Sequence, residues 1–394
     1  MDLPVVIAGA GIGGLSAALA LAAAGHRVLV VEKAGVLVEV GAGLQLSPNA
    51  CRVLDDLGVL DSLRPHAVAP RNIRIGSGRT GREIAKIELG DRITARHGAP
   101  YLVVHRADLQ KALFDRAMTR DRIDIRLDSE VIDTGDTPDG TLQCHIRSGA
   151  VIAAVPARAL IGADGVWSAI RGRVPGHRQA NYTGLTAYRA TLPAETVAGD
   201  LMADTGLWLG PNAHLVHYPI RAGREFNLVA LVPETWTEEG WSAAADRATL
   251  LDHVRNWAPN VRSLLERPEA WLKWALCGVD AGGPWTGGRI ALLGDAAHAM
   301  LPFAAQGAAM AIEDAAVLAH VLPPDAADIP AALKAYEATR RQRVKKVQET
   351  AAENGRIYHL GGPLAIGRDT VMRLMPPDRL SARQDWIYGW TPPR

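Results

Sequence analysis

Cysteine is scarce in this sequence. Its 394 residues include three cysteines, Cys51, Cys144 and Cys277, which are odd in number and far apart. Neither a disulfide framework nor the paired ligand spacing of a zinc site fits this arrangement. We therefore expect a protein of a reducing compartment, the cytoplasm, with no bound metal.

Net charge is nearly absent as well. Lys and Arg together number 43 and Asp and Glu 42, which leaves a formal net charge of +1. Without an overall field, binding to nucleic acid or to an anionic membrane is not expected. One basic run lies on a helical pattern between acidic residues, and we interpret it as a solvated helix face. The run comprises Arg340, Arg341, Arg343, Lys345 and Lys346, flanked by Glu337, Glu349 and Glu353.

Charge is missing altogether from Leu3 to Gly25, and hydropathy alone suggests a signal peptide or a transmembrane helix there. Asp2, however, stands where a signal peptide carries basic residues. The apolar run is also interrupted by four glycines, Gly9, Gly11, Gly13 and Gly14. We expect a strand from Pro4 to Ala8, a turn, an Ala-rich helix from Leu15 to Ala24, and no membrane segment.

The glycines form the pattern Gly9-x-Gly11-x-x-Gly14, and a second buried strand, Arg27 to Glu32, follows the helix. In this βαβ context such a turn lets a pyrophosphate approach the backbone, while the helix N-terminus supplies free N–H groups and partial positive charge. Glu32, with Lys33 after it, is placed to accept hydrogen bonds from an adenosine ribose. The segment predicts a dinucleotide site but does not separate FAD from NAD.

The pattern of elements changes along the chain. Helices predicted at Pro48–Leu57 and Arg106–Thr119, and a strand at Ile123–Leu127, continue an α/β arrangement. From Thr205 to Val232, short alternating segments between Gly-Pro-Asn and Arg-Ala-Gly turns predict an antiparallel meander. The chain ends with a buried strand at Arg289–Leu293, helices at Ala305–Leu322 and from Ala331 into the 350s, and an irregular tail containing proline.

Two motifs separate FAD from NAD. One is Leu160-Ile-Gly-Ala-Asp164-Gly165-Val-Trp167-Ser168-x-x-Arg171, and the other is Leu292-Leu-Gly294-Asp295-Ala-Ala-His298, which leads through Pro302 to Gln306-Gly307. On local grounds alone, Asp295 could cap a helix and Asp164-Gly165 could form an ordinary turn. With the N-terminal pattern, however, their order and spacing resemble the single-component flavoprotein aromatic hydroxylases. This family includes 4-hydroxybenzoate 3-hydroxylase, salicylate hydroxylase, 3-hydroxybenzoate 6-hydroxylase and 6-hydroxynicotinate 3-monooxygenase, and the resemblance runs from Val5 to about Val347.

The resemblance implies an α/β protein with a discontinuous Rossmann-type FAD-binding domain, an antiparallel-sheet substrate domain and a C-terminal helical segment. We predict the FAD-binding domain at residues 1–70, 101–175 and 285–345, and the substrate domain at residues 71–100 and 176–284. A C-terminal helix and tail follow at residues 346–394. The oligomeric state stays open, with a homodimer as one alternative.

The resemblance also assigns contacts to a non-covalent FAD. In the family, the residue matching Asp295 binds the flavin ribitol, and Arg106 matches an arginine that reaches the flavin, although a solvated arginine is the alternative. Gln45 lies where the family loop passes the flavin, and Asp164 belongs to a segment that also meets the nicotinamide donor. The helix after Gln306 points its N-terminus at the flavin and would stabilise the reduced anion by roughly 1 kcal/mol. The predicted cofactor contacts are Gly9, Gly11, Gly14, Glu32, Lys33, Gln45, Arg106, Asp164, Asp295, Gly307 and Ala308.

The meander carries the candidate base. In a strand with a two-residue period, His214 and Tyr218 share one face and His217 lies on the other. A flavin C4a-hydroperoxide reacts readily with an aromatic ring only after a ring hydroxyl loses its proton, and a histidine can take that proton at neutral pH. The His-x-x-x-Tyr pattern resembles the 3-hydroxybenzoate 6-hydroxylase and 6-hydroxynicotinate 3-monooxygenase branch. We predict His214 as the base and Tyr218 beside it, with a structural histidine as the alternative.

The substrate side of the predicted site is apolar. Pro302 matches a position where the family backbone approaches the substrate, and Phe303 lies where subfamilies differ. We predict Pro302, Phe303 and Trp208 as substrate contacts, and no arginine is clearly placed by the sequence to hold an acid. His298, after the Gly-Asp turn, is interpreted as a structural histidine.

Together these features predict an FAD-dependent monooxygenase that consumes NADH or NADPH and dioxygen. Its predicted substrate is a small phenol or hydroxypyridine, often a carboxylate. A flavin oxidase, halogenase or reductase on the same fold remains an alternative, as does a non-catalytic flavin-binding protein, because sites rather than folds decide chemistry. The lysine that a halogenase needs in a Trp-rich motif is not found in the sequence.

Overall fold

A computed structural model describes residues 3–37, 43–137 and 140–393. Its central sheet has six strands in the order β18-β19-β11-β1-β2-β7, and all neighbours are parallel except the short β18–β19 pair. The four strands in the middle of this order are buried along their whole length, which explains their continuous apolar runs. The strands are β1 (Val5–Ala8), β2 (Val28–Val31), β7 (Ile123–Arg126), β11 (Ala159–Gly162), β18 (Thr286–Gly287) and β19 (Ile290–Leu292).

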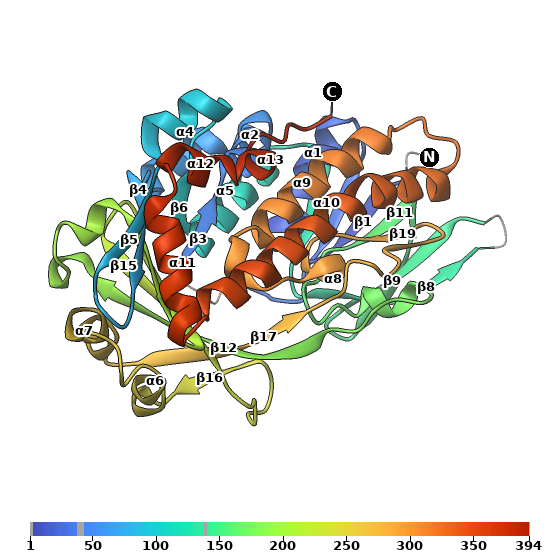
Figure 1. The fold of residues 1–394 in the computed structure, drawn as a ribbon. Helices are drawn as coiled ribbons and strands as arrows, with labels where there is room; N and C mark the ends of the chain where they lie inside the picture. Colours follow the sequence, from blue (N-terminus) through green and yellow to red (C-terminus); the bar gives the residue numbers. More distant parts are fainter. Residues whose placement is uncertain (1–2, 38–42, 138–139, 394) are drawn as a thin grey trace.

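Helices from both halves of the chain pack together beside this sheet (Figure 1). The uncharged N-terminal run forms β1 and α1 (Ile12–Ala23), as predicted, and α1 packs on α9 (Gly307–Val321). The approach is close, because a Cβ atom at Gly13 would lie 2.8 Å from Leu293 Cδ2 and 3.2 Å from Ala311 Cβ. The predicted glycine turn, followed by an Ala-rich helix, is confirmed by the positions of β1 and α1. The flanking helices α5 (Arg106–Met118) and α10 (Ile329–Tyr358) pack on α1 and α9, respectively.

The second large sheet has eight strands in the order β16-β17-β12-β15-β14-β13-β4-β5. Strands β13, β14 and β15 are consecutive antiparallel neighbours, which confirms the predicted meander. Across β14, His214 pairs with Leu231 and Leu209, whereas His217 pairs with Leu228 and Gly206. The strands are β4 (Asn72–Ser77), β5 (Glu83–Glu88), β12 (Asn181–Pro193), β13 (Thr205–Gly210), β14 (Ala213–Ile220), β15 (Glu225–Pro233), β16 (Ser242–Ala245) and β17 (Trp271–Gly278).

Two small sheets and several short helices accompany the two large sheets. A three-stranded sheet joins β8, β9 and β10, and a two-stranded sheet joins β3 to β6. These strands are β3 (Gly43–Leu46), β6 (Leu102–His105), β8 (Ser129–Asp136), β9 (Leu142–Ser148) and β10 (Val151–Ala157). The short helices are α2 (Pro48–Asp56), α3 (Leu60–Leu63), α4 (Gly90–His97), α6 (Arg247–His253), α7 (Pro259–Glu266) and α8 (Asp295–His298). Single helical turns are η1 (Arg64–His66), η2 (Ile170–Arg173), η3 (Ala194–Thr196), η4 (Leu201–Ala203) and η5 (Pro302–Ala304).

The C-terminal segment is helical, so the prediction of an irregular tail was wrong. It forms α11 (Gly362–Leu374), α12 (Pro377–Ala382) and α13 (Asp385–Tyr388). Prolines near the start of α11 and α12 are compatible with helix because the first turn needs no N–H from them. Figure 1 shows α11 and α12 beside β5, and both helices contact this strand.

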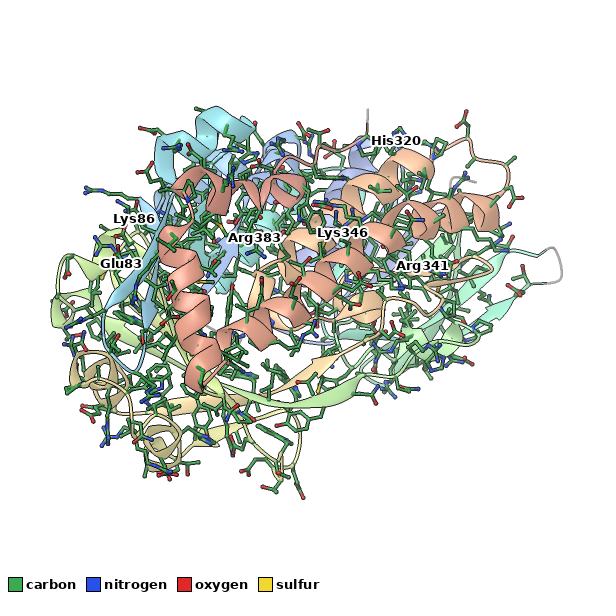
Figure 2. All side chains as sticks on the ribbon, viewed as in Figure 1. Glu83, Lys86, His320, Arg341, Lys346 and Arg383 are labelled. Atoms are coloured by element: carbon green, nitrogen blue, oxygen red, sulfur yellow. The ribbon has the colours of Figure 1, made fainter. Side chains whose placement is uncertain are left out.

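The basic run on α10 is only partly solvated, so its interpretation as an exposed face was also wrong. Arg340 is 1% exposed, and its guanidinium binds Glu313 Oε2 at 2.6 Å and Asp314 Oδ1 at 2.7 Å. Arg343 also binds Glu313, whereas Lys345 and Lys346 are exposed. Figure 2 labels Arg341 and Lys346 on this helix. Two buried acids on α9, rather than water, neutralise the inward arginines.

No helix in the described ranges is both long and apolar enough to cross a membrane. Within the same ranges, no group of three or more His, Cys, Asp or Glu side chains is arranged to hold a metal ion. The domain boundaries given above stay a prediction.

Candidate active site

The three glycines of the N-terminal turn have different surroundings. A Cβ atom at Gly9, where φ is +105°, would lie 2.5 Å from the carbonyl oxygen of Ala163, and one at Gly14 would lie 2.0 Å from that of Gly9. Gly11, in contrast, has no heavy atom of another element within 4 Å of the position of its Cβ. The outer glycines are therefore required by packing, and the middle one leaves open space where a pyrophosphate would approach the backbone.

Glu32 lies next to this turn. Its carboxylate accepts hydrogen bonds from Ala10 N at 2.8 Å and from Ala34 N at 2.9 Å. An ionised carboxylate has about four acceptor positions, so two stay available for ribose hydroxyls. Lys33 follows with an exposed side chain. Helix α1 begins at the same turn with no side-chain cap, which leaves its first N–H groups free for an anion.

Asp295 is exposed although the residues before and after it are buried. The preceding Gly294 has a φ of +61° and donates its N–H to Asp314 Oδ2 at 3.0 Å. His298 Nε2 lies 2.6 Å from the same oxygen, and Arg340 binds the other oxygen. Although burial opposes it, the charges of His298 and Arg340 lower the pKa of the Asp314 carboxyl to about 2. Asp314 thus holds the turn before Asp295 and binds His298 inside the fold, and the structural role of His298 stays a prediction.

The Asp-Gly loop is tied to the Asp295 turn. Asp164 Oδ2 accepts hydrogen bonds from Ala169 N at 2.8 Å and Ile170 N at 3.1 Å, while Oδ1 is buried without a partner in the described residues. Arg171, which is 3% exposed, donates to the carbonyl oxygens of Val166 and Ala296. One arginine therefore holds together the two loops that the family motifs single out.

The N-terminus of α9 is also uncapped. Gln306 occupies the cap position, but its side chain bonds Ser47 Oγ at 2.9 Å and Asn49 Nδ2 at 3.1 Å instead of the helix N–H groups. Gly307 has no neighbour within 4 Å of the position of its Cβ, and Ala308 is partly exposed beside it. The free N–H groups and the helix dipole at this point both favour a negatively charged group.

Arg106 and Gln45 lie on neighbouring elements. Arg106 begins α5 directly after β6, and Gln45 on β3 pairs with Val103 of β6. The side chain of Gln45 accepts a hydrogen bond from the Tyr101 hydroxyl. The loop before Gln45 includes Gly41 and Ala42, which lie outside the described residues.

His214 is 2% exposed and is held by aromatic rings. Its ring centroid lies 5.1 Å from that of Phe303 and 5.6 Å from that of Tyr358. Nδ1 of His214 lies 2.9 Å from Nε2 of His359, the residue directly after α10, whereas Nε2 of His214 has no hydrogen bond with another described residue. Burial, and to a smaller extent His359, holds the pKa of His214 well below its usual value, so the ring is neutral at pH 7.

Tyr218 shares this face of the sheet. It is 3% exposed, and a Cβ atom at Gly43 would lie 2.3 Å from its ring. Asn227, its pairing partner on β15, accepts a hydrogen bond from Gly43 N at 3.2 Å, while its buried Nδ2 has no partner in the described residues. Burial raises the pKa of Tyr218, although nearby Arg189 and Arg106 oppose the rise.

Arg189 is a site residue that sequence reasoning missed. On β12, Arg189 pairs with Val229 and lies two residues from Ala187. Ala187 and Val229 both belong to the hydrophobic cluster that contains Phe303. Its guanidinium stacks over Trp274 at 5.2 Å and makes no ion pair with a described acid. Burial, followed by the positive charge of Arg106, lowers its pKa to about 10. The signal available in the sequence was that Arg189 is the one charged residue of β12.

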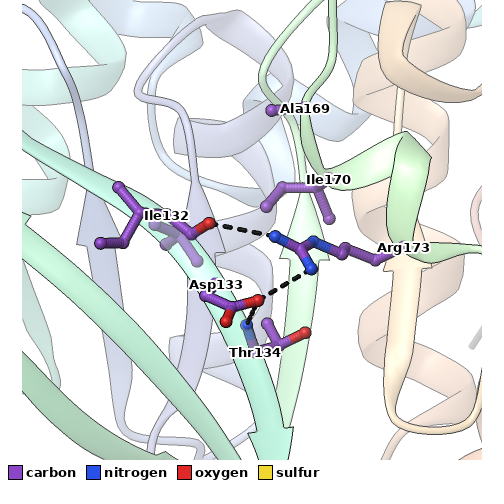
Figure 3. Close-up of a pocket in the computed structure, with 7 residues that line it drawn as sticks. Ile132, Asp133, Thr134, Ala169, Ile170 and Arg173 are labelled. Atoms are coloured by element: carbon purple, nitrogen blue, oxygen red, sulfur yellow. Dashed lines mark hydrogen bonds and ion pairs between the residues drawn. The ribbon is translucent and has the colours of Figure 1, made fainter.

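The predicted substrate contacts do not all come together. Pro302 and Phe303 form η5 beside His214. Trp208 lies on the opposite face, where its indole N–H donates to His217 Nε2 at 3.0 Å. The small hollow in Figure 3 is elsewhere, between β8 and η2, and Arg173 closes it by bonding Ile132 O and Asp133. It contains none of the predicted site residues, so we do not place a substrate there.

Comparisons with known proteins show the family of this chain. A family model described as an FAD binding domain matches residues 2–351. The chain is 37% identical to 3-hydroxybenzoate 6-hydroxylase 1 of Aquipseudomonas alcaligenes, over 98% of this chain and 97% of the relative. It is 34% identical to 6-hydroxynicotinate 3-monooxygenase of Bordetella bronchiseptica, over 89% and 91%. A structure of Klebsiella pneumoniae HpxO complexed with FAD and uric acid superimposes with a TM-score of 0.81 at 27% identity, over 97% and 95%.

Proposed function

This chain belongs to the family of FAD-dependent aromatic monooxygenases, and on that premise we propose that it hydroxylates a small phenolic or hydroxypyridine acid with NADH or NADPH as donor. When bound, FAD would take up hydride and, with dioxygen, supply the electrophilic oxygen. The residues we propose to hold it surround open space at two uncapped helix N-termini, near Gly11 and Gly307. Glu32 and Asp295 supply acceptors for its hydroxyl groups.

We propose His214 as the base that removes the proton of the substrate hydroxyl. The observation that carries this assignment is that His214 is fixed by ring contacts and keeps one ring nitrogen without a described partner, while burial lowers its pKa. A base must be unprotonated and have an available lone pair, and Nε2 of His214 supports the assignment because it has no described hydrogen-bond partner. Phe303 and Tyr358 pack against the ring, with Pro302 before Phe303 in η5, and Tyr218 lies four residues further along the same face of β14.

Arg189 supports an acid as the substrate. Arg189 is partly buried and its Nε is buried without a described partner, which is costly for a cation that has no opposite charge. A carboxylate can accept two parallel hydrogen bonds from its planar donors. The unpartnered Nδ2 of Asn227 lies on the same face of the sheet and offers a further donor. We propose that these groups bind the carboxylate while His214 meets the hydroxyl.

Matched substrate pairs test this function. We expect 3-hydroxybenzoate or 6-hydroxynicotinate to stimulate NADH oxidation with equal formation of hydroxylated product. The uncharged 3-hydroxybenzamide should have a KM about tenfold to a hundredfold higher than 3-hydroxybenzoate, because a hydrogen bond to a charged group contributes about 1.5–3 kcal/mol. Arg189→Met should remove this preference. Substrate-stimulated NADH oxidation that yields only hydrogen peroxide across the panel would contradict hydroxylation and favour an oxidase.

A further inference from the structure

We propose that His359 and His214 form a two-histidine relay that carries the proton of the substrate hydroxyl to solvent. The inference rests on the proposed function, and it adds a residue that does not touch the substrate. His359 acts through His214 as a positioning and relay residue. It lies 145 residues further along the chain, directly after α10.

The two rings are joined by a hydrogen bond and by packing. Nδ1 of His214 lies 2.9 Å from Nε2 of His359, and the ring centroids lie 5.1 Å apart. Phe303 packs on both rings, with centroids 5.1 Å from His214 and 5.6 Å from His359. Between two nitrogens at this distance one must carry the proton, so the tautomers of the rings are coupled.

The backbone holds His359 in place. Its carbonyl oxygen accepts a hydrogen bond from Asn212 N at 3.2 Å, in the turn between β13 and β14. A Cβ atom at Gly361 would lie 3.3 Å from Pro211 in the same turn. The end of α10 is therefore docked on the hairpin that carries His214, and the two histidines keep their distance.

The two ends of the pair face different surroundings. Nε2 of His214 is in a buried ring next to Phe303, whereas the His359 side chain is partly exposed and its Nδ1 bonds no described residue. The pair thus connects a buried atom that would meet the substrate with one that can reach water. His217 has no such connection, because its Nε2 accepts the Trp208 N–H and its Nδ1 is buried.

The lowered pKa values of the two rings favour transfer of a proton through the pair over its retention on either ring. Burial lowers the pKa of both rings, and Arg368 contributes to the lowering at His359, whose pKa is about 4. The other groups facing the pair are Tyr358 and Phe303, and Arg368 itself bonds the carbonyl oxygens of Ile357 and Tyr358 and the Asp369 carboxylate. Neither histidine would keep a proton taken from a phenol, so the proton must move on.

The transfer balances within the chain. The substrate O–H bond breaks and an N–H bond forms at His214 Nε2, while the proton on His214 Nδ1 moves to His359 Nε2. The proton on His359 Nδ1 then goes to water. The reverse movement returns one proton to the product oxygen and restores both tautomers, so no further reagent is needed.

Proton release on substrate binding tests the relay. With 3-hydroxybenzoate as probe and a pH indicator in weak buffer, rapid mixing should show release of one proton by the FAD-loaded wild-type enzyme. His359→Gln should slow this release by about tenfold or more, because one step of acid–base catalysis is lost. FAD content and the Kd of 3-hydroxybenzoate should stay unchanged. Added imidazole should restore the rate in His359→Ala but not in His214→Gln.

The controls separate the relay from folding and from the proposed function. His320→Gln replaces an exposed histidine on α9, labelled in Figure 2, and should release the proton at the wild-type rate. Wild-type release by both His359 variants would overturn the relay while leaving the proposed function in place. The relay would also be overturned if FAD-loaded His359→Ala released the proton slowly and added imidazole did not restore the rate. His359 would then have only a structural role. A wild-type enzyme that neither binds nor hydroxylates the panel phenols overturns the proposed function itself.

Discussion

His214 and His217 lie three residues apart on β14 and face opposite sides of the eight-stranded sheet. Each is 2% exposed, and burial lowers the pKa of each. Their hydrogen bonds differ, because His214 has one nitrogen bonded to His359 and one without a described partner, whereas Trp208 occupies Nε2 of His217. Burial and a shifted pKa therefore do not distinguish a base from a structural histidine. An available lone pair with a route for the proton does.

The surroundings of the two faces differ in the same way. On the His214 face, two buried nitrogen atoms have no described hydrogen-bond partner. They are Nδ2 of Asn227 and Nε of Arg189. On the His217 face, the neighbouring side chains belong to an apolar cluster that includes Leu215 and Phe226. The other face also holds an unpartnered buried atom, Nδ1 of His217, so the donors near His214 indicate a ligand there only together with the available Nε2 of His214.

The largest effect should come from the His214 face. We expect His214→Gln to keep FAD and accept hydride but to lose hydroxylation by about a hundredfold or more, the scale of a general base. Reduced flavin would then react with oxygen without attacking the ring, so hydrogen peroxide should rise as product falls. The measurement is the ratio of product to NADH consumed. Product formation that stays coupled in this variant would remove His214 as the base.

A smaller effect is expected on the same face at Tyr218. Tyr218→Phe keeps the ring that packs near Gly43 and removes one hydroxyl. If this hydroxyl bonds the substrate, as we propose, loss of that hydrogen bond, about 0.5–1.5 kcal/mol, should lower coupled product formation by about twofold to tenfold. The measurement is product and hydrogen peroxide in parallel for Tyr218→Phe. If this variant were as uncoupled as His214→Gln, Tyr218 itself would carry the proton.

The smallest effect on activity should come from His217→Gln, the matched variant on the other face. Coupling should match the wild type, and the change should appear in stability at acid pH instead. The folded pKa of His217 is about 4, and a histidine in the unfolded chain has a pKa of about 6.5, so the unfolded state binds more protons between these values. Stability is therefore lost as pH falls from about 6.5 toward 4. The drop in Tm between neutral pH and pH 5 should be smaller in His217→Gln. If His217→Gln uncoupled the enzyme while His214→Gln kept coupled product formation, the faces assigned to the two histidines would be reversed.

Local patterns were enough to predict much of this arrangement. The two-residue period correctly separated His214 from His217, and the glycine turn, the meander and the long α9 helix followed from spacing and composition. These features depend on residues close together in the chain. The roles of the site residues stay predictions.

The features that were missed depend on partners far away in the sequence. Arg340 is buried because Glu313 and Asp314 face it across a helix pair, and nothing near Arg340 signals this. His359 meets His214 only through the docking of α10 on a distant hairpin. Trp208 was expected near Phe303, but the register of β13 against β14 pairs it with Leu215 and turns it to the other face. Register between strands is not fixed by the pattern of one strand.

The close packing of α1 on α9 also bears on how the protein is made. The glycine turn at residues 9–14 is synthesised first, and α9, which contributes the other uncapped helix N-terminus, comes roughly 300 residues later. At about 5–20 residues per second, the nascent chain carries half of a nucleotide site for about 15–60 s before the other half exists. If both helix N-termini hold the flavin, as we propose, cofactor loading is a late event in biosynthesis, and a chain whose translation stops before Gly307 cannot complete the site.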